Sequence, residues 1–391
     1  MNNDELQVLG TENRKSNNRK WIIAAVCVVL SIVCYIIYNR CSSTDHSLPM
    51  SQEGSTISPA LQHAADSLLN DKLTEINVLQ GQVIIMTVHT GEILAMAGRE
   101  RNFEGKFQPC QNFAYQQELG ALTMTVSLLV GLESGKAHLS DVVDTGNGVW
   151  QIDDDRIMKD HNWRRGGYGE VTLDRALGVS SNIGISKTIW SLFKGHEQDY
   201  FNKLDSMSFG QPNSIEGIEG LRPSVYSSPK DSDWVNKDIL WSAIGYNRKI
   251  APIQMLTFYN AIANNGKMVK PTLVPGTAEV VIEQFAKIEN IALMQQTLEH
   301  VVSQGLGNKA GSDRIKVAGK TGTSQVNEYY EGDNTVSEYQ LAFCGFFPAN
   351  KPKYSRIVSL NKIGLPASGV GMAGTLFHDI SEYLINTNIN N

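Results

Sequence analysis

Residues 317–325 place a lysine and two threonines around a glycine, as Lys320-Thr321-Gly322-Thr323. This run combines one cation with two hydroxyl groups, which are groups that can hold a polar ligand. A lone Lys-Thr-Gly is a weak signal, because a tripeptide recurs by chance. Two further features make a functional role more credible. Apolar residues precede the tripeptide, and a second polar motif, Ser180-Ser181-Asn182, stands at the expected start of a helix. We take the two motifs as a candidate site.

The elements that must position these motifs follow from hydrophobic periodicity. Residues 61–73 have the pattern of an amphipathic helix, and residues 82–98 have that of a β-hairpin. Near the C-terminus, residues 341–347 and 356–360 predict two strands, and residues 370–384 predict a last helix. Strands at both ends of the chain, with a helical middle, favour an α+β domain.

Together the motifs resemble the penicillin-binding proteins and serine β-lactamases, whose second and third motifs are S-x-N and K-T/S-G. The resemblance extends to residues 91–96, 171–184, 242–266 and 346–354, and covers about residues 61–386. It is strongest for class B penicillin-binding proteins of the septal, cell-division type. It implies an antiparallel sheet flanked by helices, together with an all-helical lobe.

The chain departs from this pattern at the family's first motif, S-x-x-K at a helix N-terminus. Ala121 stands where the nucleophilic serine is expected, and Met124 where the lysine is expected. Glu118, Gly120 and the helix end at residues 132–135 fix this register. The chain therefore resembles a truncated paralogue whose S-x-x-K motif is degenerate.

The chemistry explains why this departure matters. Acyl transfer from a D-Ala-D-Ala peptide needs a nucleophile, and a serine needs a nearby base such as a lysine one turn later. Ala121 has no oxygen and Met124 has no basic nitrogen. Loss of a nucleophile costs on the order of 10⁶ in rate. We expect a pseudoenzyme that forms no acyl-enzyme and acts as a partner or stem-peptide-binding protein in wall synthesis and cell division.

An active D,D-transpeptidase or carboxypeptidase with an unrecognised nucleophile is the alternative. Three other S-x-x-K pairs follow Ser180, which is the wrong order for the family; they are Ser191–Lys194, Ser227–Lys230 and Ser359–Lys362. Thr123, Thr125 and Ser127 lie on the expected helix, but no lysine or histidine follows any of them within one turn.

The resemblance implies roles for what remains of the site. In the resembling family, the lysine of the third motif and the threonine that follows the motif help to hold the terminal carboxylate of the peptide. Lys320 and Thr323 match these positions, with Thr321 and Gly322 between them in the expected substrate site. Ser180 and Asn182 would hydrogen-bond the peptide backbone. The alternative is that these residues are structural: Gly322 for a close approach between strands, and Asn182 for helix capping.

Residues 21–38 are 18 consecutive residues without a charge, about 27 Å of helix. Lysines and arginines crowd the N-terminal side, so we expect an uncleaved signal anchor with residues 1–20 in the cytoplasm. A buried core helix is the alternative. Residues 39–60 are an expected linker, 61–386 the extracytoplasmic domain, and 387–391 a tail. The expected location is the inner (plasma) membrane, with wall-synthesis or division proteins as partners.

Composition bounds the remaining interpretations. Thirty-four basic and 40 acidic residues give a net charge of −6, which argues against nucleic acid as a partner. The five cysteines and eight histidines show no metal-ligand spacing, so we predict neither a metal nor a cofactor. Cys344 is an expected core residue, whereas Cys110 is either a thiol or a partner of Cys41. The run Trp163-Arg164-Arg165 is either a glycan contact or a solvated loop.

Overall fold

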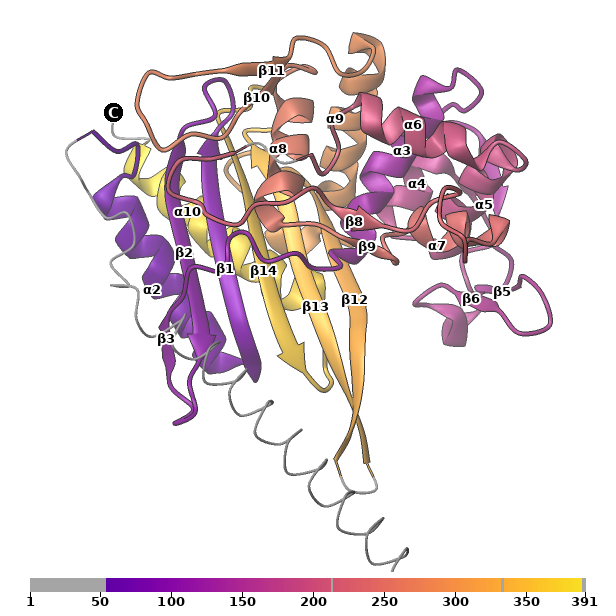
Figure 1. The fold of residues 1–391 in the computed structure, drawn as a ribbon, viewed down its shortest axis with the longest axis horizontal. Coiled ribbons are helices and arrows are strands. Elements are labelled where there is room, and N and C mark those ends of the chain that lie inside the picture. Colours follow the sequence, from indigo (N-terminus) through magenta and orange to yellow (C-terminus); the bar gives the residue numbers. More distant parts are fainter. Residues whose placement is uncertain (1–53, 212–213, 332–333, 389–391) are drawn as a thin grey trace, which may run out of the picture. The chain divides into compact units, whose positions relative to one another are not determined.

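A computed structural model of the chain describes residues 54–211, 214–331 and 334–388. Its centre is a six-stranded antiparallel sheet in the order β12-β13-β14-β1-β2-β3 (Figure 1). The strands are β1 (Val78–Thr87), β2 (Ile93–Arg101), β3 (Phe107–Pro109), β12 (Ala318–Glu331), β13 (Asn334–Phe347) and β14 (Tyr354–Ile363). The predicted hairpin at residues 82–98 and both predicted C-terminal strands are confirmed.

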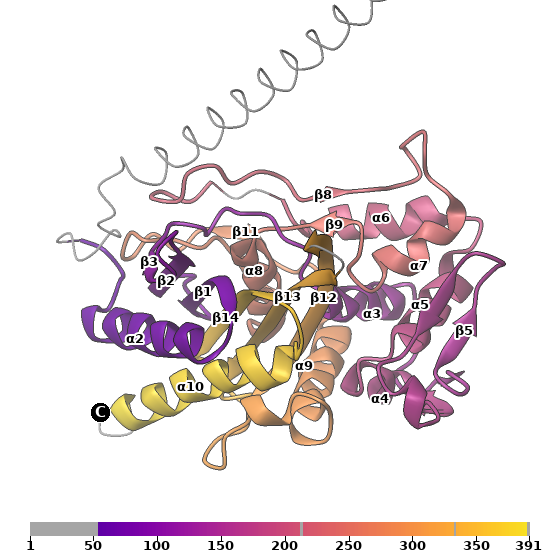
Figure 2. The same cartoon turned by 90° about the horizontal axis from the view of Figure 1, so that it is seen from below.

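Helices from the two ends of the described chain cover one face of the sheet. They are α2 (Pro59–Glu75) and α10 (Thr375–Asn388), and Figure 2 shows them under the strands. A π-helical turn, η5 (Gly369–Gly374), leads into α10. Leu69, Phe343 and Phe377, all fully buried, belong to the hydrophobic cluster between these helices and the sheet. The predicted helices at residues 61–73 and 370–384 are thus confirmed, although the second begins as a π-turn.

The opposite face packs against α8 (Pro252–Ala263), which contacts β13 and β14. Cys344, on β13, is completely buried, as predicted for a core residue. The α+β fold class expected from the sequence is confirmed by this arrangement of an antiparallel sheet between helices.

A lobe of helices lies beyond the β12 edge of the sheet (Figure 1). Its helices are α3 (Thr123–Glu133), α4 (Leu173–Gly178), α5 (Asn182–Phe193), α6 (Glu197–Ser206) and α7 (Ile239–Ser242), and α9 (Ile288–Ser303) packs against both α4 and β12. Short 3-10 turns add η1 (Gly120–Leu122), η2 (Trp163–Arg165), η3 (Asn236–Asp238) and η4 (Asn308–Ala310). The run Trp163-Arg164-Arg165 therefore forms a 3-10 turn, with both arginines exposed.

Four small two-stranded sheets complete the fold. They pair β4 (Val142–Asp144) with β7 (Glu170–Thr172), β5 (Val149–Gln151) with β6 (Ile157–Lys159), β8 (Val225–Tyr226) with β9 (Arg248–Lys249), and β10 (Met268–Val269) with β11 (Val280–Ile282). The expected membrane anchor at residues 21–38 and Cys41 lie outside the described residues. Within the described ranges, every helix is too short or too polar to cross a membrane.

Candidate functional site

The N-terminus of α5 is held by the residues of the second motif. The Ser181 hydroxyl accepts a hydrogen bond from the Gly184 amide at 2.9 Å, which makes Ser181 the N-cap. Asp160 is completely buried and accepts from the Ser181 hydroxyl at 2.7 Å and from the Ile183 amide at 3.1 Å. The structural alternative for Asn182 as the helix cap is therefore wrong, because Ser181 fills that position.

Asn182 instead begins the helix, and its side-chain amide donates to the Lys159 carbonyl at 2.9 Å. This bond ties α5 to the end of β6. The side-chain amide of Asn182 thus already makes one hydrogen bond within the protein, while the side chain stays partly exposed.

Ser180, just before the cap, carries its side chain to the third motif. The Lys320 ammonium donates to the Ser180 hydroxyl at 2.9 Å and to the Thr321 carbonyl at 2.9 Å. Ser180 has a φ of +53°, a left-handed conformation that is uncommon for residues other than glycine. Lys320 is completely buried, and burial lowers its pKa to about 7. The lysine can therefore be charged or neutral near physiological pH.

Met124 occupies the other side of Ser180. The Ser180 hydroxyl lies 3.7 Å from the Met124 sulfur, in the first turn of α3. Met124 is fully buried and Ala121, in η1, is 8% exposed. The structure thus brings Met124, Ser180 and Lys320 together in one chain of contacts.

Glycine allows η1 to lie directly against β12. A Cβ on Gly322 would stand 2.5 Å from the Leu119 carbonyl oxygen, which is closer than real atoms approach. The Ser324 hydroxyl adds a hydrogen bond to the Glu118 carbonyl at 2.6 Å. The close approach at Gly322 is therefore between β12 and the start of η1, and not between two strands as the sequence suggested. This contact positions Ala121 beside the third motif.

The threonines of the third motif differ in exposure. Thr323 is exposed and its hydroxyl accepts from the Gly369 amide at 3.0 Å, whereas Thr321 is buried. Lys320 pairs with Cys344 in the strand ladder and Thr321 with Phe343, so neighbouring side chains point to opposite faces. The exposed hydroxyl of Thr323 is the group of this motif that an incoming ligand reaches first.

Two hydroxyl groups on α3, those of Thr125 and Ser127, are engaged inside the protein. The Ser127 hydroxyl is within 2.8 Å of the Tyr200 hydroxyl and donates to the Ala243 carbonyl at 2.7 Å. Thr125 accepts from the Tyr259 hydroxyl at 2.7 Å, and both Thr125 and Ser127 are completely buried. Neither can reach a substrate without unpacking the lobe.

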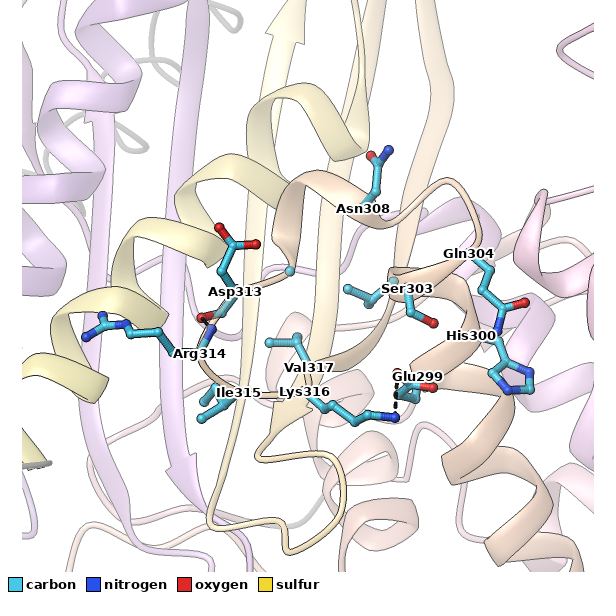
Figure 3. Close-up of a pocket in the computed structure, with 13 residues that line it drawn as sticks. Glu299, His300, Ser303, Gln304, Asn308, Asp313, Arg314, Ile315, Lys316 and Val317 are labelled. Carbon is cyan, nitrogen blue, oxygen red and sulfur yellow. Dashed lines mark hydrogen bonds and ion pairs between the residues drawn. The ribbon is translucent and has the colours of Figure 1, made fainter.

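A separate cavity of about 750 Å³ lies between the end of α9, η4 and the approach to β12 (Figure 3). Two pairs of charged residues form ion pairs in its wall. Lys316 pairs with Glu299 at 3.4 Å, and His300 pairs with Asp174 at 3.1 Å. None of the motif residues lines this cavity, so it is distinct from the candidate site.

Sequence reasoning missed Asp160, which fixes the second motif from 21 residues away. No local pattern marks this aspartate, because a buried carboxylate at a helix N-terminus is recognised only from the three-dimensional contact. The adjacent serines were a usable signal, since the second of two serines before an apolar run fits an N-cap.

The comparisons agree with the motifs. Residues 81–382 match the family described as Penicillin binding protein transpeptidase domain. A peptidoglycan D,D-transpeptidase FtsI homolog of Mesostigma viride is 24% identical over 84% of this chain and 60% of its own length. Stage V sporulation protein D of Bacillus subtilis is 26% identical over 75% of this chain and 46% of its own length. The chain thus spans about half the length of these relatives.

Solved structures share the fold. The transpeptidase domain of Burkholderia pseudomallei penicillin-binding protein 3 has a TM-score of 0.72 at 21% identity, covering 86% of this chain and 96% of that one. Penicillin-binding protein 3 of Mycobacterium tuberculosis, complexed with aztreonam, has a TM-score of 0.70 at 22% identity, covering 86% of this chain and 79% of that one. The family match spans most of the chain, and the chain belongs to the penicillin-binding-protein transpeptidase family.

Proposed function

We propose that this protein is a non-acylating member of its family that serves peptidoglycan synthesis in cell division. The observation that carries the proposal is the contact of the Met124 sulfur with Ser180, together with Ala121 in the preceding turn. A serine nucleophile and its lysine base would occupy these two positions in a family enzyme. Here they are replaced by a methyl group and a thioether, neither of which can attack a carbonyl or take up a proton.

The site keeps groups that suit binding without cleavage. Lys320 supplies a positive charge when protonated, and Thr323, three residues further along the same strand, exposes a hydroxyl. We propose that Lys320, Thr321, Gly322 and Thr323 hold the terminal carboxylate of a stem peptide non-covalently. Gly322 contributes through the close approach of backbones that it permits.

The same proposal includes a place in the cell. Residues 21–38 would anchor the protein in the inner membrane, with the domain of residues 61–386 outside the cytoplasm. Wall-synthesis or division proteins would then be its partners. The uncharged stretch of the sequence and its basic N-terminal flank support this part of the proposal.

One contact favours a second candidate function, an acyl-transferring enzyme that uses Ser180. The Lys320 amine lies 2.9 Å from the Ser180 hydroxyl, and a lysine with a pKa of about 7 is often neutral at neutral pH. A neutral Lys320 would take the hydroxyl proton while the serine oxygen attacks an amide or lactam carbonyl. The protonated lysine would then give that proton to the departing nitrogen.

Intact-mass analysis after incubation with benzylpenicillin separates the two candidates. The full-length protein, purified in mild detergent, should gain no mass. The double variant Ala121→Ser with Met124→Lys should gain one penicilloyl group, because the rest of the cleft is in place. Its melting temperature, measured alongside, shows whether the variant is folded.

A stoichiometric adduct on the wild-type protein would contradict the non-acylating proposal. Loss of that adduct in the Ser180→Ala variant would then assign the reaction to Ser180. Ser191→Ala is the matched control, because Ser191 lies in α5 with its hydroxyl bonded to the Thr188 carbonyl at 2.8 Å. This control should behave as the wild-type protein in either case.

A further inference from the structure

A group of cations surrounds Trp163, in the turn that follows β6 on the outer side of the lobe (Figure 1). The Lys159 ammonium and the guanidinium carbon of Arg164 each lie 4.6 Å from the centroid of the Trp163 ring. These two charges are therefore no more than about 9 Å apart, close to the Debye length of about 8 Å at physiological ionic strength. Arg165 is the next residue of η2, and all three cationic side chains are exposed. We call Lys159, Arg164 and Arg165 the cationic turn.

The cationic turn is not neutralised by ion pairs. Among the described residues, no carboxylate forms a salt bridge with any of its three side chains. Nearby cations differ, because Arg156 pairs with Asp153 at 2.8 Å and Lys237 pairs with the same carboxylate at 3.0 Å. Asp160 follows Lys159 directly, but its carboxylate is buried against the start of α5. Like charges are thus held close together, and a bound anion would relieve their repulsion.

Tight backbone packing holds the cationic turn in place. A Cβ on Gly148 would stand 2.9 Å from the Cα of Trp163, and a Cβ on Gly167 would stand 2.2 Å from the backbone nitrogen of Gly148. The Asp160 amide also donates to the Gly148 carbonyl at 3.0 Å. The backbone of the turn is therefore positioned before any ligand arrives, which lowers the entropic cost of binding.

The indole of Trp163 is not free to stack on a sugar. Two cations already lie over its ring, and the neighbouring Trp150 has Lys187 over its ring at 5.4 Å. A sugar ring would have to displace these cations to reach the aromatic surface. Of the two interpretations of Trp163-Arg164-Arg165, the glycan contact is thus disfavoured in its aromatic form. The exposed cations remain as the groups that can bind a ligand.

The compact arrangement of the charges favours one kind of anion. A guanidinium group binds a phosphate or a carboxylate through two parallel hydrogen bonds, and an ammonium group adds a point charge. A carboxylate carries one negative charge. A phosphate monoester carries a charge of about −1.5 to −2 at pH 7 and offers three strong acceptor oxygens. Three cations gathered at one ring therefore match a phosphate group better than a single carboxylate.

We propose that the cationic turn is a binding site for a phosphate group, carried by a phosphate monoester or a pyrophosphate. The site adjoins the candidate peptide site, since the Lys159 carbonyl accepts from Asn182 at 2.9 Å. Burial lowers the pKa of His161, and the charges of Arg165 and Lys320 lower it further, so this histidine feels both sites. The inference goes beyond the proposed function and does not depend on it, because phosphate binding here uses no residue of the third motif.

Isothermal titration calorimetry with inorganic pyrophosphate tests the site on the full-length protein in mild detergent. Pyrophosphate should bind with a Kd of about 1 mM or less, as expected for a few charge-assisted hydrogen bonds. The affinity should fall as sodium chloride is raised from about 50 to 300 mM, because salt screens exposed charges. Lys159→Gln and Arg164→Gln should each weaken binding by about threefold to tenfold.

Lys309→Gln is the matched control. Lys309 is also an exposed lysine without an ion pair among the described residues, but it lies in η4. This variant should bind pyrophosphate as the wild-type protein does. Melting temperatures, measured for all variants, show whether each one is folded.

Two further ligands distinguish a lipid headgroup from a soluble phosphate. Glycerol 3-phosphate and dihexanoylphosphatidic acid carry the same phosphate monoester, and only the second carries acyl chains. The Lys159→Gln variant, titrated with the same lipid, corrects for lipid that enters the detergent. Tighter binding of the lipid after this correction would support a lipid headgroup as the ligand. Equal binding of the two would support a soluble phosphate.

Three results would overturn the inference. One is that no phosphate ligand binds, and another is that pyrophosphate binds equally to the wild-type protein, Lys159→Gln and Arg164→Gln. The third is that hexaglutamate binds while the phosphate ligands do not, which would identify the cationic turn as a docking surface for an acidic peptide. None of these results bears on the benzylpenicillin experiment, so the proposed function would stand or fall separately.

Discussion

Lys320 is the residue of the site whose charge changes near neutral pH. Its pKa falls to about 7 because burial disfavours the ammonium form. Two ionisable neighbours could affect its charge. Burial raises the pKa of the Cys344 thiol, so this group stays neutral. Burial lowers the pKa of the His161 imidazole, so this group is also mostly neutral at pH 7. Neither supplies a negative charge that would hold Lys320 protonated. A carboxylate ligand would supply that charge.

Peptide binding should therefore depend on pH. Above pH 7 the ammonium fraction of free Lys320 falls about tenfold per unit, so the affinity for a D-Ala-D-Ala carboxylate should fall as pH rises from 7 to 9. Binding at pH 8 should take up a proton, because the carboxylate raises the pKa of Lys320. Calorimetry in buffers of different ionisation enthalpy measures both effects. A peptide affinity independent of pH across this range would contradict a role for Lys320.

Met124 is the residue on which the proposed loss of acyl-transfer chemistry depends. A methionine is close to a lysine in length and adapts to irregular gaps, so it fills the position without an unpaired buried charge. Its sulfur still contacts the Ser180 hydroxyl at 3.7 Å. Ser180 still contacts Lys320 beside this methionine, as the proposal of binding without acylation requires.

Among the secondary-structure elements, the N-terminus of α5 fixes the position of Ser180. Asp160→Ala should lower the free energy of unfolding by about 2 kcal/mol, because it leaves the Ser181 hydroxyl and the Ile183 amide without their buried acceptor. It should also weaken peptide binding, since Ser180 directly precedes the cap. Denaturant unfolding and calorimetry measure the two effects. Asp154→Ala, an exposed change in the turn between β5 and β6, is the control and should alter neither.

The contact between η1 and β12 gives a second test at this scale. Gly322→Ala should destabilise the protein by about 1–3 kcal/mol, because the new methyl group would meet the Leu119 carbonyl and push η1 from the strand. Gly178→Ala is the matched control, since a Cβ there meets nothing within 4 Å in α4. That change should stabilise the protein by about 0.4–1 kcal/mol. Equal effects of the two changes on thermal unfolding would refute the tight contact.

Elements with a local signal were predictable from the sequence. The hairpin of β1 and β2 follows from two apolar runs around a Thr-Gly turn, and the start of α5 from its serines. The strands β12 and β13 extend well beyond the predicted apolar segment at residues 341–347. Their outer parts are mostly polar, as in residues 335–340, where only Val336 and Tyr339 are apolar or aromatic, so hydrophobic periodicity does not detect them.

The site was predictable only where its residues belong to motifs. The positions of Ala121, Met124, Ser180 and Lys320 follow from spacing along the chain. The contact of Asp160 with Ser181 depends on how the end of β6 packs against the start of α5, which no local pattern encodes. The glycine-rich run before α10 was assigned to the helix, but it forms a π-turn whose Gly369 amide reaches Thr323.

At the scale of the whole molecule, the sheet joins the two ends of the described chain. Helices α2 and α10 pack against each other and against the same face, far from each other in sequence. Phe377 of α10 is central to this contact: its ring lies 4.6 Å from that of Phe343, and the buried Arg356 guanidinium lies 3.6 Å from its centroid. Removal of this ring would disturb the sheet from the face opposite α8.

Tryptophan fluorescence can show whether the stability of the lobe depends on the contact between Phe377 and Phe343. Five of the six lie at positions 150–241, in the lobe or its small sheets, and the sixth is Trp21. Phe377→Ala should lower the free energy of unfolding by about 3–5 kcal/mol. If the sheet and the lobe unfold as one unit, the urea midpoint should fall equally when it is followed by tryptophan fluorescence and by far-ultraviolet circular dichroism. Phe377→Leu should lose less, because it keeps most of the volume. A fluorescence midpoint that stays at the wild-type value while the dichroism midpoint falls would mean that the lobe folds independently. Peptide binding would then depend on how two separately stable parts meet at Ser180 and Lys320.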